Sequence, residues 1–234
     1  MINYGNKTVK SAYIGAPVQK MYIGNNVVFS TGDEWDTIFQ RENDGTYTSL
    51  PIGITLPLNI NNTVIDMELI AIDADALTSG GNAKLTWMSK NIFIIKRMND
   101  STSNGDFWKD SEIRAYLENN ILPTIQINVR NQIKNVTKIS YRRSSTMEET
   151  HDNIFVPSSR ELNLGYNTET SGVVYSHFST AQSRRKQWNG SNHAYFTRSA
   201  YISNATSYYI VNENGTGEYR ASTSEYGIVI GFCT

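Results

Sequence analysis

The C-terminal stretch, residues 193–234, constrains the fold of this chain more than any other segment. Short runs rich in Tyr, Ile and Val alternate there with polar turns that contain Gly, a pattern typical of short β-strands joined by tight turns. The stretch ends in an apolar run at residues 228–232. Because burial removes apolar surface from water, we expect this run to close a sheet and the rest of the domain to be arranged to receive it.

An arginine lies among aromatic and hydroxyl residues in this stretch, in the sequence YFTRS at residues 195–199. A charge inside a strand-rich core needs carboxylate or carbonyl acceptors, because an unpaired buried charge is strongly unfavourable. We therefore predict that Arg198 is a structural arginine that holds the closing strands together, with Ser199 beside it. Phe232 and Cys233 are expected to lie buried behind it.

The composition argues against several classes of protein. The 21 Lys and Arg residues nearly balance the 22 Asp and Glu residues, so no broad basic field favours nucleic acid or an anionic membrane surface. The single cysteine excludes an internal disulfide. No apolar run approaches the roughly 20 residues that span a bilayer, and the N-terminus lacks a signal-peptide pattern. We expect neither nucleic-acid binding nor membrane insertion.

Residues 1–32 contain a short internal repeat. The tripeptide YIG at residues 13–15 recurs at residues 22–24, and a valine follows each copy. Each copy predicts a strand, a glycine turn and a second strand. Two such hairpins bury little surface alone, so the segment is either a β-meander leading into the main domain or a module that docks on another chain. The polar break that follows separates domain 1–32 from domain 33–234.

The segment after this break predicts an antiparallel sheet. A short apolar patch lies at residues 35–39. Pro51 and Pro57 favour an edge strand within residues 50–60, because proline cannot donate a backbone hydrogen bond. Further strands are predicted at residues 64–72, 84–88 and 92–97. Short connections favour the pairing of these consecutive strands in one sheet.

The clearest helical signals lie in the middle of the chain. Asp110 is predicted to cap a helix whose apolar residues recur at helical spacing up to Pro123. A second helix is predicted over residues 125–136 from its apolar stripe. Arg114 on the first helix, close to Trp108 in sequence, is expected to bond to backbone carbonyls or to a buried carboxylate.

Composition also gives expectations for the segments that follow the helices. The polar and charged sequence at residues 142–151 predicts a loop, and the apolar sequence at 153–157 predicts a buried strand. Another strand is predicted at residues 173–175. The charged segment at residues 180–190 is expected to form solvated surface.

Six blocks of the sequence resemble, in order, the signatures of an uncharacterised domain family. The blocks are KLTWMSKNI at residues 84–92, RMN at 97–99, WKDSEIRAYL at 108–117, DNIFVPS at 152–158, YFTRS at 195–199 and GIVIGFC at 227–233. That family occurs in tail and virion proteins of phages and prophages of Gram-positive bacteria, and in surface proteins of such bacteria. The fifth block has Tyr-Phe where many relatives have Trp-Trp or Tyr-Trp, which keeps its aromatic character. The N-terminal repeat likewise resembles short β-repeats that precede receptor-binding or fibre domains in phage tail proteins.

The closing strands are also similar to the C-type lectin-like fold, as used in relatives of the formylglycine-generating enzyme and in phage receptor-binding proteins. This resemblance implies an α+β, lectin-like domain with antiparallel sheets and two central helices, preceded by the small β-repeat segment. The chain lacks the acidic and Asn motifs through which calcium-dependent lectins bind sugar, and it lacks the paired cysteines of the oxidase. We therefore expect no cofactor and no oxidase chemistry.

The sequence offers weak candidates for a reaction centre. His151, His177 and His193 lie in polar contexts without the spacing of a metal site. His177, Asp152 and Ser158 supply the residue types of a catalytic triad, but the sequence has no strained nucleophile turn of the Gly-x-Ser-x-Gly type. We expect no metal and no catalysis.

A pair of acidic residues precedes a Gly-Gly turn, at Asp73 and Asp75. A calcium loop would require further oxygen ligands at fixed spacing, and the sequence does not supply them. We interpret the pair as residues that solvate a loop.

Aromatic residues beside polar loops are the remaining candidates for function. Amphipathic rings mixed with Asn, Ser and Thr are typical of adaptable recognition surfaces for protein or carbohydrate. The alternative is that these rings pack on the sheet. The predicted binding residues are Tyr166, Tyr175, Trp188, Tyr201, Tyr208, Tyr209, Asn214 and Tyr219. The turns at residues 203–207 and 212–217 are the places where we expect recognition.

Together, the resemblance and the loop composition favour a phage or prophage virion protein of the tail tip or fibre apparatus. It would bind a host-surface protein or carbohydrate without catalysis, while residues 1–32 attach it to other virion proteins. A homo-oligomer is expected by analogy with phage fibres. The first alternative is a capsid or tail decoration that binds only virion neighbours. The second is a hydrolase that acts on surface polysaccharide.

Overall fold

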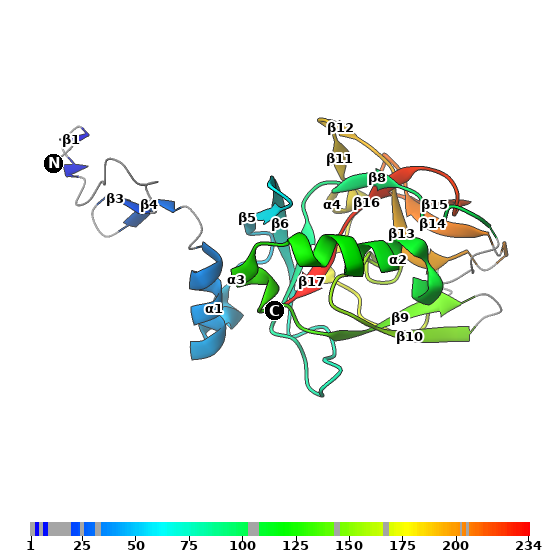
Figure 1. Ribbon diagram of the computed structural model, residues 1–234, viewed down its shortest axis with the longest axis horizontal. Coiled ribbons are helices and arrows are strands. Elements are labelled where there is room, and N and C mark those ends of the chain that lie inside the picture. Colours follow the sequence, from blue (N-terminus) through cyan, green and yellow to red (C-terminus); the bar gives the residue numbers. More distant parts are fainter. Residues whose placement is uncertain are drawn as a thin grey trace. The chain divides into compact units, whose positions relative to one another are not determined.

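The computed structural model describes residues 3–4, 7–8, 20–23, 26–30, 34–102, 108–142, 146–165, 169–201, 203–204 and 206–234 (Figure 1). The chain forms two compact units, Met1–Thr48 and Ser49–Thr234. This boundary lies later than the one expected at residues 32–33, because helix α1 (Glu34–Asp44) belongs to the first unit.

The described residues of the first unit include two short strand pairs. β1 (Asn3–Tyr4) pairs with β2 (Lys7–Thr8), and β3 (Lys20–Ile23) pairs with β4 (Asn26–Ser30), both in antiparallel orientation. The second copy of the YIG repeat begins in β3, and the hairpin predicted there is confirmed. The first copy lies outside the described residues.

Helix α1 occupies the stretch in which the sequence predicts only a short apolar patch. Trp35, Ile38 and Phe39 are buried and recur at the spacing of one helical face. The rings of Trp35 and Phe39 stack with 6.1 Å between their centroids. Glu34 lies in the first turn, where its charge complements the helix dipole. The patch is therefore the apolar face of an amphipathic helix that continues to Asp44.

The second unit contains a four-stranded antiparallel sheet with the order β17-β7-β6-β5. Its strands are β5 (Thr55–Ile60), β6 (Thr63–Ile72), β7 (Leu85–Ser89) and β17 (Gly231–Cys233). β5 lies at the edge, as Pro57 predicts. Phe232 of β17 lies opposite Trp87 of β7, so the apolar C-terminus closes this sheet as predicted.

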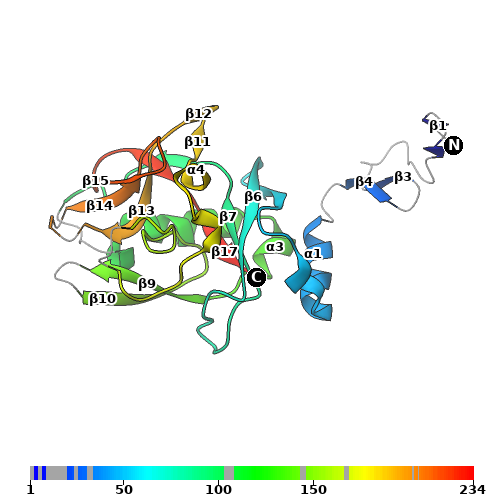
Figure 2. The same cartoon turned by 180° about the vertical axis from the view of Figure 1, so that it is seen from behind.

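A five-stranded sheet with the order β15-β14-β13-β16-β8 forms the other part of this unit. Its strands are β8 (Ile94–Lys96), β13 (Tyr195–Ala200), β14 (Ser207–Val211), β15 (Gly217–Ala221) and β16 (Tyr226–Ile228). β13 and β16 are parallel, and the other pairs are antiparallel. β14 and β15 lie at the opposite end of the unit from β6 (Figures 1 and 2).

The prediction that residues 92–97 extend the first sheet is wrong. β8 pairs with β16 of the five-stranded sheet, and the amide of Phe93 already donates to the carbonyl of Ile228. The C-terminal strands β16 and β17 belong to different sheets, so this single segment of chain connects the two. The chain from β7 to β8 runs alongside this segment, because β7 pairs with β17 in one sheet and β8 pairs with β16 in the other.

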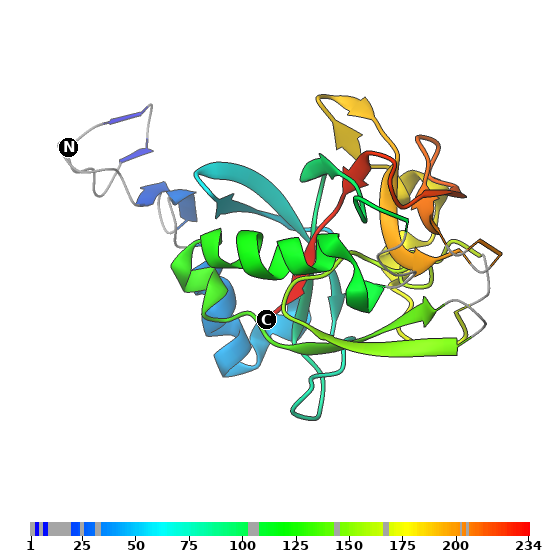
Figure 3. The same cartoon turned by 45° about the vertical axis from the view of Figure 1, so that its right-hand side comes forward.

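One continuous helical run crosses the second unit, drawn in green in Figure 3. It consists of the 3-10 turn η2 (Trp108–Asp110), α2 (Glu112–Tyr116), the π-helical turn η3 (Leu117–Ile121) and the 3-10 turn η4 (Leu122–Thr124). The N-cap is Ser111, whose Oγ accepts from the amide of Arg114 at 3.3 Å. The prediction of Asp110 as the cap is wrong because Asp110 belongs to the preceding turn.

The second predicted helix is mostly absent. α3 (Ile127–Arg130) is a single turn, and Lys134 then pairs with Cys233 of the closing strand. This pairing keeps the following chain extended, so Val136 begins a strand rather than ending a helix. With its two sheets and these helical segments, the second unit has an α+β architecture.

The segment expected to be a polar loop at residues 142–151 lies in a β-hairpin. β9 (Val136–Arg142) and β10 (Thr146–Asp152) pair antiparallel along their lengths. Polar side chains occupy the buried positions of this hairpin, among them Lys138, Ser140 and Asp152. Because these buried positions are polar, the sequence lacks the alternation of apolar and polar residues from which a strand is normally predicted.

The segments between β10 and β13 are mostly irregular. Phe155 is buried and pairs with Gly231 through two backbone hydrogen bonds, which is the extended conformation predicted there. Residues 173–175 form no strand and lead into the 3-10 turn η5 (Ser176–Phe178). α4 (Ala181–Arg184) and the hairpin of β11 (Gln187–Trp188) and β12 (Ser191–Asn192) follow. Within the described residues, no helix is long and apolar enough to cross a membrane.

Candidate functional site

Arg198 on β13 is 1% exposed although its side chain is large and charged. Its Nη1 donates to Glu161 Oε2 at 2.5 Å and its Nη2 donates to Glu161 Oε1 at 2.8 Å, which makes a bidentate pair. Further hydrogen bonds from the guanidinium reach the carbonyls of Val156 and Ile139 and the hydroxyl of Ser140. The acceptors predicted for Arg198, a buried carboxylate and backbone carbonyls, are therefore present.

Lys138 on β9 lies beside this pair and is also 1% exposed. Its Nζ donates to Asp75 Oδ1 at 2.5 Å, to Tyr175 Oη at 2.9 Å and to Glu161 Oε1 at 3.2 Å. Asp75 is buried rather than loop-solvating, because Lys138 neutralises its carboxylate. Tyr175, a predicted binding residue, is likewise buried and donates its hydroxyl to Asp75, so its side chain belongs to the core. We call Asp75, Lys138, Glu161 and Arg198 the buried charge cluster.

The cluster fixes the protonation of its members. Burial raises the pKa of Glu161, but the charges of Arg198 and Lys138 outweigh burial and lower that pKa to about 2. Burial lowers the pKa of Lys138, whereas the carboxylates of Asp75 and Glu161 raise it above its ordinary value. Burial, assisted by Asp75, also raises the pKa of the Cys233 thiol well above its ordinary value. Near neutral pH, Glu161 and Lys138 are therefore charged and Cys233 is a neutral thiol.

Two further buried carboxylates hold the other residues predicted to be structural. Ser199 Oγ donates to Glu169 Oε1 at 2.7 Å. Asp152 accepts from Arg114 Nε at 2.6 Å and from Trp108 Nε1 at 2.8 Å. Arg114 thus bonds to a buried carboxylate, as predicted, and Ser199 and Trp108 each donate to one.

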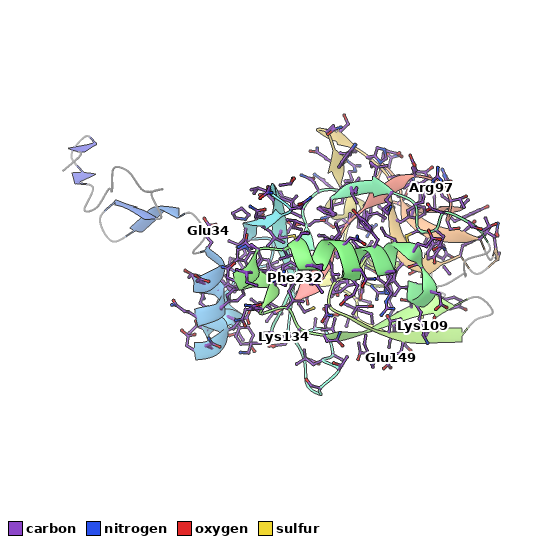
Figure 4. The ribbon with its side chains drawn as sticks, in the orientation of Figure 1. Glu34, Arg97, Lys109, Lys134, Glu149 and Phe232 are labelled. Atoms are coloured by element: carbon purple, nitrogen blue, oxygen red, sulfur yellow. The ribbon has the colours of Figure 1, made fainter. Side chains whose placement is uncertain are left out.

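Phe232 is completely buried. Figure 4 labels its position in the second unit. It lies on the closing strand β17, whose next residue, Cys233, is also buried. The expectation for these two residues is confirmed. Arg198, the buried carboxylates and the closing strand therefore all lie in the interior of the second unit.

A groove on the outer strands of the five-stranded sheet gathers several of the predicted recognition residues. It has a volume of about 530 Å³. Its lining residues, which we call the tyrosine groove, are Tyr201, Ser203, Tyr209, Gly217, Glu218, Tyr219 and Arg220. Most of these residues come from β14, from the edge strand β15 and from the segment that follows β13. The volume lies in the range of small-ligand sites.

Three tyrosine rings form the floor and wall of the groove. Tyr209 and Tyr219 lie opposite each other in the β14–β15 pair. The ring of Tyr201 stacks on Tyr219 with 3.9 Å between centroids and 2° between planes, and it meets Tyr209 edge-on at 5.4 Å. Tyr219 remains 49% exposed, so one large aromatic surface faces the solvent.

Charged groups lie next to these rings. Arg220 Nη2 donates to Glu218 Oε2 at 2.6 Å, and its Nε donates to Tyr226 Oη at 3.0 Å. Both members of the Arg220–Glu218 pair are partly exposed, so their remaining donor and acceptor positions are open to a ligand. Arg220 lies opposite Tyr208 and Tyr219 lies opposite Tyr209 in the β14–β15 pair, so the charged pair leaves the edge strand on the other face from the exposed ring. The groove therefore combines a ring surface on one face of β15 with charged groups that line it around the strand edge.

The turn between β14 and β15 is held in one conformation. Asn212 Oδ1 accepts from the amides of Asn214 and Thr216, and Gly215 has a φ of 80°. Arg184 of α4 donates from Nε to the carbonyl of Gly215 at 2.9 Å. These contacts fix the strands that carry the tyrosines.

Replacing Gly215 with alanine is expected to destabilise the second unit by about 1–3 kcal/mol. The new Cβ would lie 1.8 Å from the backbone oxygen of Ala181, and the φ of 80° is unfavourable for alanine. Gly190→Ala is the matched control, because Gly190 has the same φ but has no atom within 4 Å of an added Cβ. Urea unfolding of both variants measures the cost. Equal losses in the two variants would show that the contact with Ala181 is unimportant.

The remaining predicted binding residues lie in different environments. Tyr208 is buried on the opposite side of β14 from Tyr209, with its ring edge-on to Phe196 at 6.3 Å, so its placement in a recognition loop is wrong. Trp188 on β11 is partly buried against the core. Asn214 is exposed in the β14–β15 turn. Tyr166 lies outside the described residues.

The triad that can be drawn from the sequence is not assembled. His177 Nε2 lies 3.4 Å from Glu68 Oε2, and Asp152 is instead engaged by an arginine and a tryptophan. Ser158 Oγ accepts from the amide of Glu161. Across the described ranges, no group of three or more His, Cys, Asp and Glu side chains is arranged to hold a metal ion.

Several residues of both sites are missed by sequence reasoning. Lys138, Asp75 and Glu161 carry the buried charge cluster, yet each lies in a segment whose local sequence is polar. Glu218 and Arg220 of the groove have one available signal: they alternate with Tyr219 along an edge strand.

The part of the chain that matches a known family contains most residues of the buried charge cluster and of the tyrosine groove. Residues 76–233 match the family described as a domain of unknown function (DUF6273). No curated protein and no solved structure matches the chain. The matched segment contains three members of the buried charge cluster, all of the tyrosine groove and the whole closing strand β17. Because this segment spans more than half of the chain, the protein belongs to the DUF6273 family.

Proposed function

We propose that the protein is a non-catalytic component of a phage or prophage virion, and that its second unit recognises carbohydrate on the host surface through the tyrosine groove. The observation that carries recognition is the exposed ring of Tyr219, which stacks on Tyr201 at an edge strand that also carries the Arg220–Glu218 pair. The assignment to a tail tip or fibre rests on the six-block resemblance. In this proposal, residues 1–32 attach the protein to other virion proteins or to sister chains.

The chemistry of the groove suits a sugar ring. One face of a pyranose presents C–H groups, which pack on an aromatic ring, while its hydroxyls need donors and acceptors at the side. Tyr219 supplies the ring, and Glu218 and Arg220, whose side chains leave β15 on its other face, supply an acceptor and donors around the strand edge. Ser203 adds a hydroxyl at the rim.

A C-type lectin-like arrangement is the finer part of the fold proposal. It is supported by the antiparallel sheet that the C-terminal strand β17 closes and by the second sheet that carries the β14–β15 turn. The buried charge cluster supports recognition indirectly. It joins β9 and β13 to the segment around Glu161 and so leaves the groove on a rigid base.

Tyr219→Ala is expected to weaken binding to wall polysaccharide from a Gram-positive host about tenfold, because it removes a stacking surface worth about 1–2 kcal/mol. Its thermal unfolding should stay close to that of the parent, since Tyr219 is 49% exposed. Tyr116→Ala is the matched control. Tyr116 is partly exposed and packs under Lys96 of β8, at the other edge of the same sheet. Binding is measured by pull-down on insoluble wall polysaccharide.

Two outcomes would overturn the proposal. The first is a parent protein that binds neither host cells nor purified wall polysaccharide. The second is a Tyr219→Ala protein that binds wall polysaccharide as the parent does, while the Tyr116→Ala protein loses this binding. Deleting residues 1–32 separates recognition from decoration, because a receptor binder still labels cells without its attachment segment and a pure decoration does not.

A further inference from the structure

A second hollow, of about 490 Å³, lies on the second unit. We call it the polar hollow. It shares no lining residue with the tyrosine groove. Its walls come from β6, from the bend after β7 and from the region of α4, β11 and β12. Charged and amide side chains dominate the lining, whereas aromatic rings dominate the groove.

Lys186 is the buried member of this lining. The sequence places it on a solvated surface, but its side chain is only 2% exposed. Its Nζ donates to the carbonyl of Ser89 at 3.1 Å, and Glu68 Oε2 lies 3.7 Å away, beyond ordinary hydrogen-bond length. Burial lowers the pKa of Lys186 to about 8, because the attraction of Glu68 compensates only in part. Lys186 is therefore a buried cation whose charge is incompletely neutralised.

Positive charge exceeds negative charge around the hollow. Lys90 and Arg185 are exposed members of the lining, and Lys186 adds the buried cation. Glu68 is the single carboxylate among the lining residues, and His177 lies beside it. A concave surface lined by one sign of charge concentrates ions of the opposite sign.

We propose that the polar hollow binds a small ligand that carries a phosphate or carboxylate group. The oxyanion lies between Lys90, Arg185 and Lys186 and completes the neutralisation of the buried ammonium. The amide side chains of the lining, such as Asn91 and Gln187, donate to hydroxyls on the rest of the ligand. The volume fits a compound of the size of a monosaccharide derivative. This site is independent of the carbohydrate recognition proposed for the tyrosine groove.

Calorimetric titration of the full chain tests the proposal with three probes: inorganic phosphate, D-glucuronate and neutral D-glucose. Saturable binding of phosphate identifies a phosphoryl ligand, and saturable binding of glucuronate identifies a sugar carboxylate. Either result, without comparable binding of glucose at the same site, supports the proposal. Binding of neither anion at millimolar concentration overturns it.

Charge reversal locates the site. Lys90→Glu is expected to weaken anion binding at least tenfold, and because Lys90 is exposed the fold should be retained. Arg97→Glu is the matched control, since Arg97 is also exposed and changes the net charge equally but pairs with Glu225 outside the hollow. Equal weakening in both variants would reflect net charge alone and would overturn the assignment of the site.

The pH dependence adds a readout for Lys186. Anion binding should weaken as the pH rises through about 8, because the ammonium, which lies near Glu68 and is influenced by Lys90, loses its charge. In Lys186→Met this loss should disappear together with most of the affinity. Unchanged affinity in a folded Lys186→Met protein would overturn the role of Lys186.

Discussion

Replacing Arg198 with alanine is expected to lower the free energy of unfolding by about 3–5 kcal/mol, the cost of breaking a buried ion pair by removing one partner. The substitution leaves Glu161 without its bidentate donor and leaves the carbonyls of Val156 and Ile139 without the guanidinium. It also removes a large, fully buried side chain from the region between β9 and β13. Urea unfolding followed by circular dichroism measures the loss.

Arg97→Ala is the control for this loss. Arg97 and Glu225 are separated by 3.5 Å, but their side chains are 44% and 63% exposed, so their pairing is screened by solvent. The control should cost about 0–1 kcal/mol. Arg198→Lys should recover only part of the stability, because an ammonium cannot match the planar fork that spans both oxygens of Glu161. An Arg198→Ala protein that unfolds at the same urea concentration as the parent would refute the structural role.

Acid is expected to destabilise the protein through Glu161 as the pH falls from about 5 to about 2. The pKa of this carboxyl is lowered from 4.5 to about 2 in the folded protein, mainly by Arg198 and Lys138 acting against burial. A lowered pKa means that the unfolded chain takes up the proton first. The stabilisation is therefore complete above about pH 4.5 and is lost as the pH falls through 2. Its size is on the order of 3 kcal/mol, at about 1.4 kcal/mol for each pH unit.

The comparison of the parent with Glu161→Gln isolates this contribution. The variant should be less stable at neutral pH, because Arg198 and Lys138 lose a charged partner. It should also lose less stability between pH 5 and pH 2 than the parent does, since one titrating carboxyl is gone. Unfolding curves in urea across this range provide the measurement. Parallel pH profiles for the two proteins would contradict the low pKa of Glu161.

The contacts of the cluster show why Asp75, Lys138 and Glu161 escape prediction. Asp75 and Lys138 are 63 positions apart in the sequence, and Glu161 and Arg198 are 37 apart. Each residue in isolation is a polar side chain that favours the surface. Burial becomes favourable only when the partner arrives from another segment, so local sequence cannot reveal it.

In the candidate recognition site, too, contacts between distant segments decide which tyrosines are exposed. Tyr208 and Tyr209 are neighbours of the same type on one strand, yet Tyr208 packs inward and Tyr209 lines the groove. Successive side chains of a strand alternate between faces, and only the pairing of β14 with β13 and β15 decides which face is covered. Composition can therefore favour a recognition surface without identifying its residues.

The sequence by itself determined the features that depend on local chemistry. An apolar C-terminal run had to be covered, Pro57 had to lie in an edge strand, and Arg114 and Arg198 needed carboxylate and carbonyl acceptors. The tertiary structure alone decided which carboxylates pair with those arginines, to which sheet β8 belongs, and which tyrosines remain at the surface. The physical reason is that these outcomes depend on contacts between distant segments, whose energies exist only once the sheets have formed.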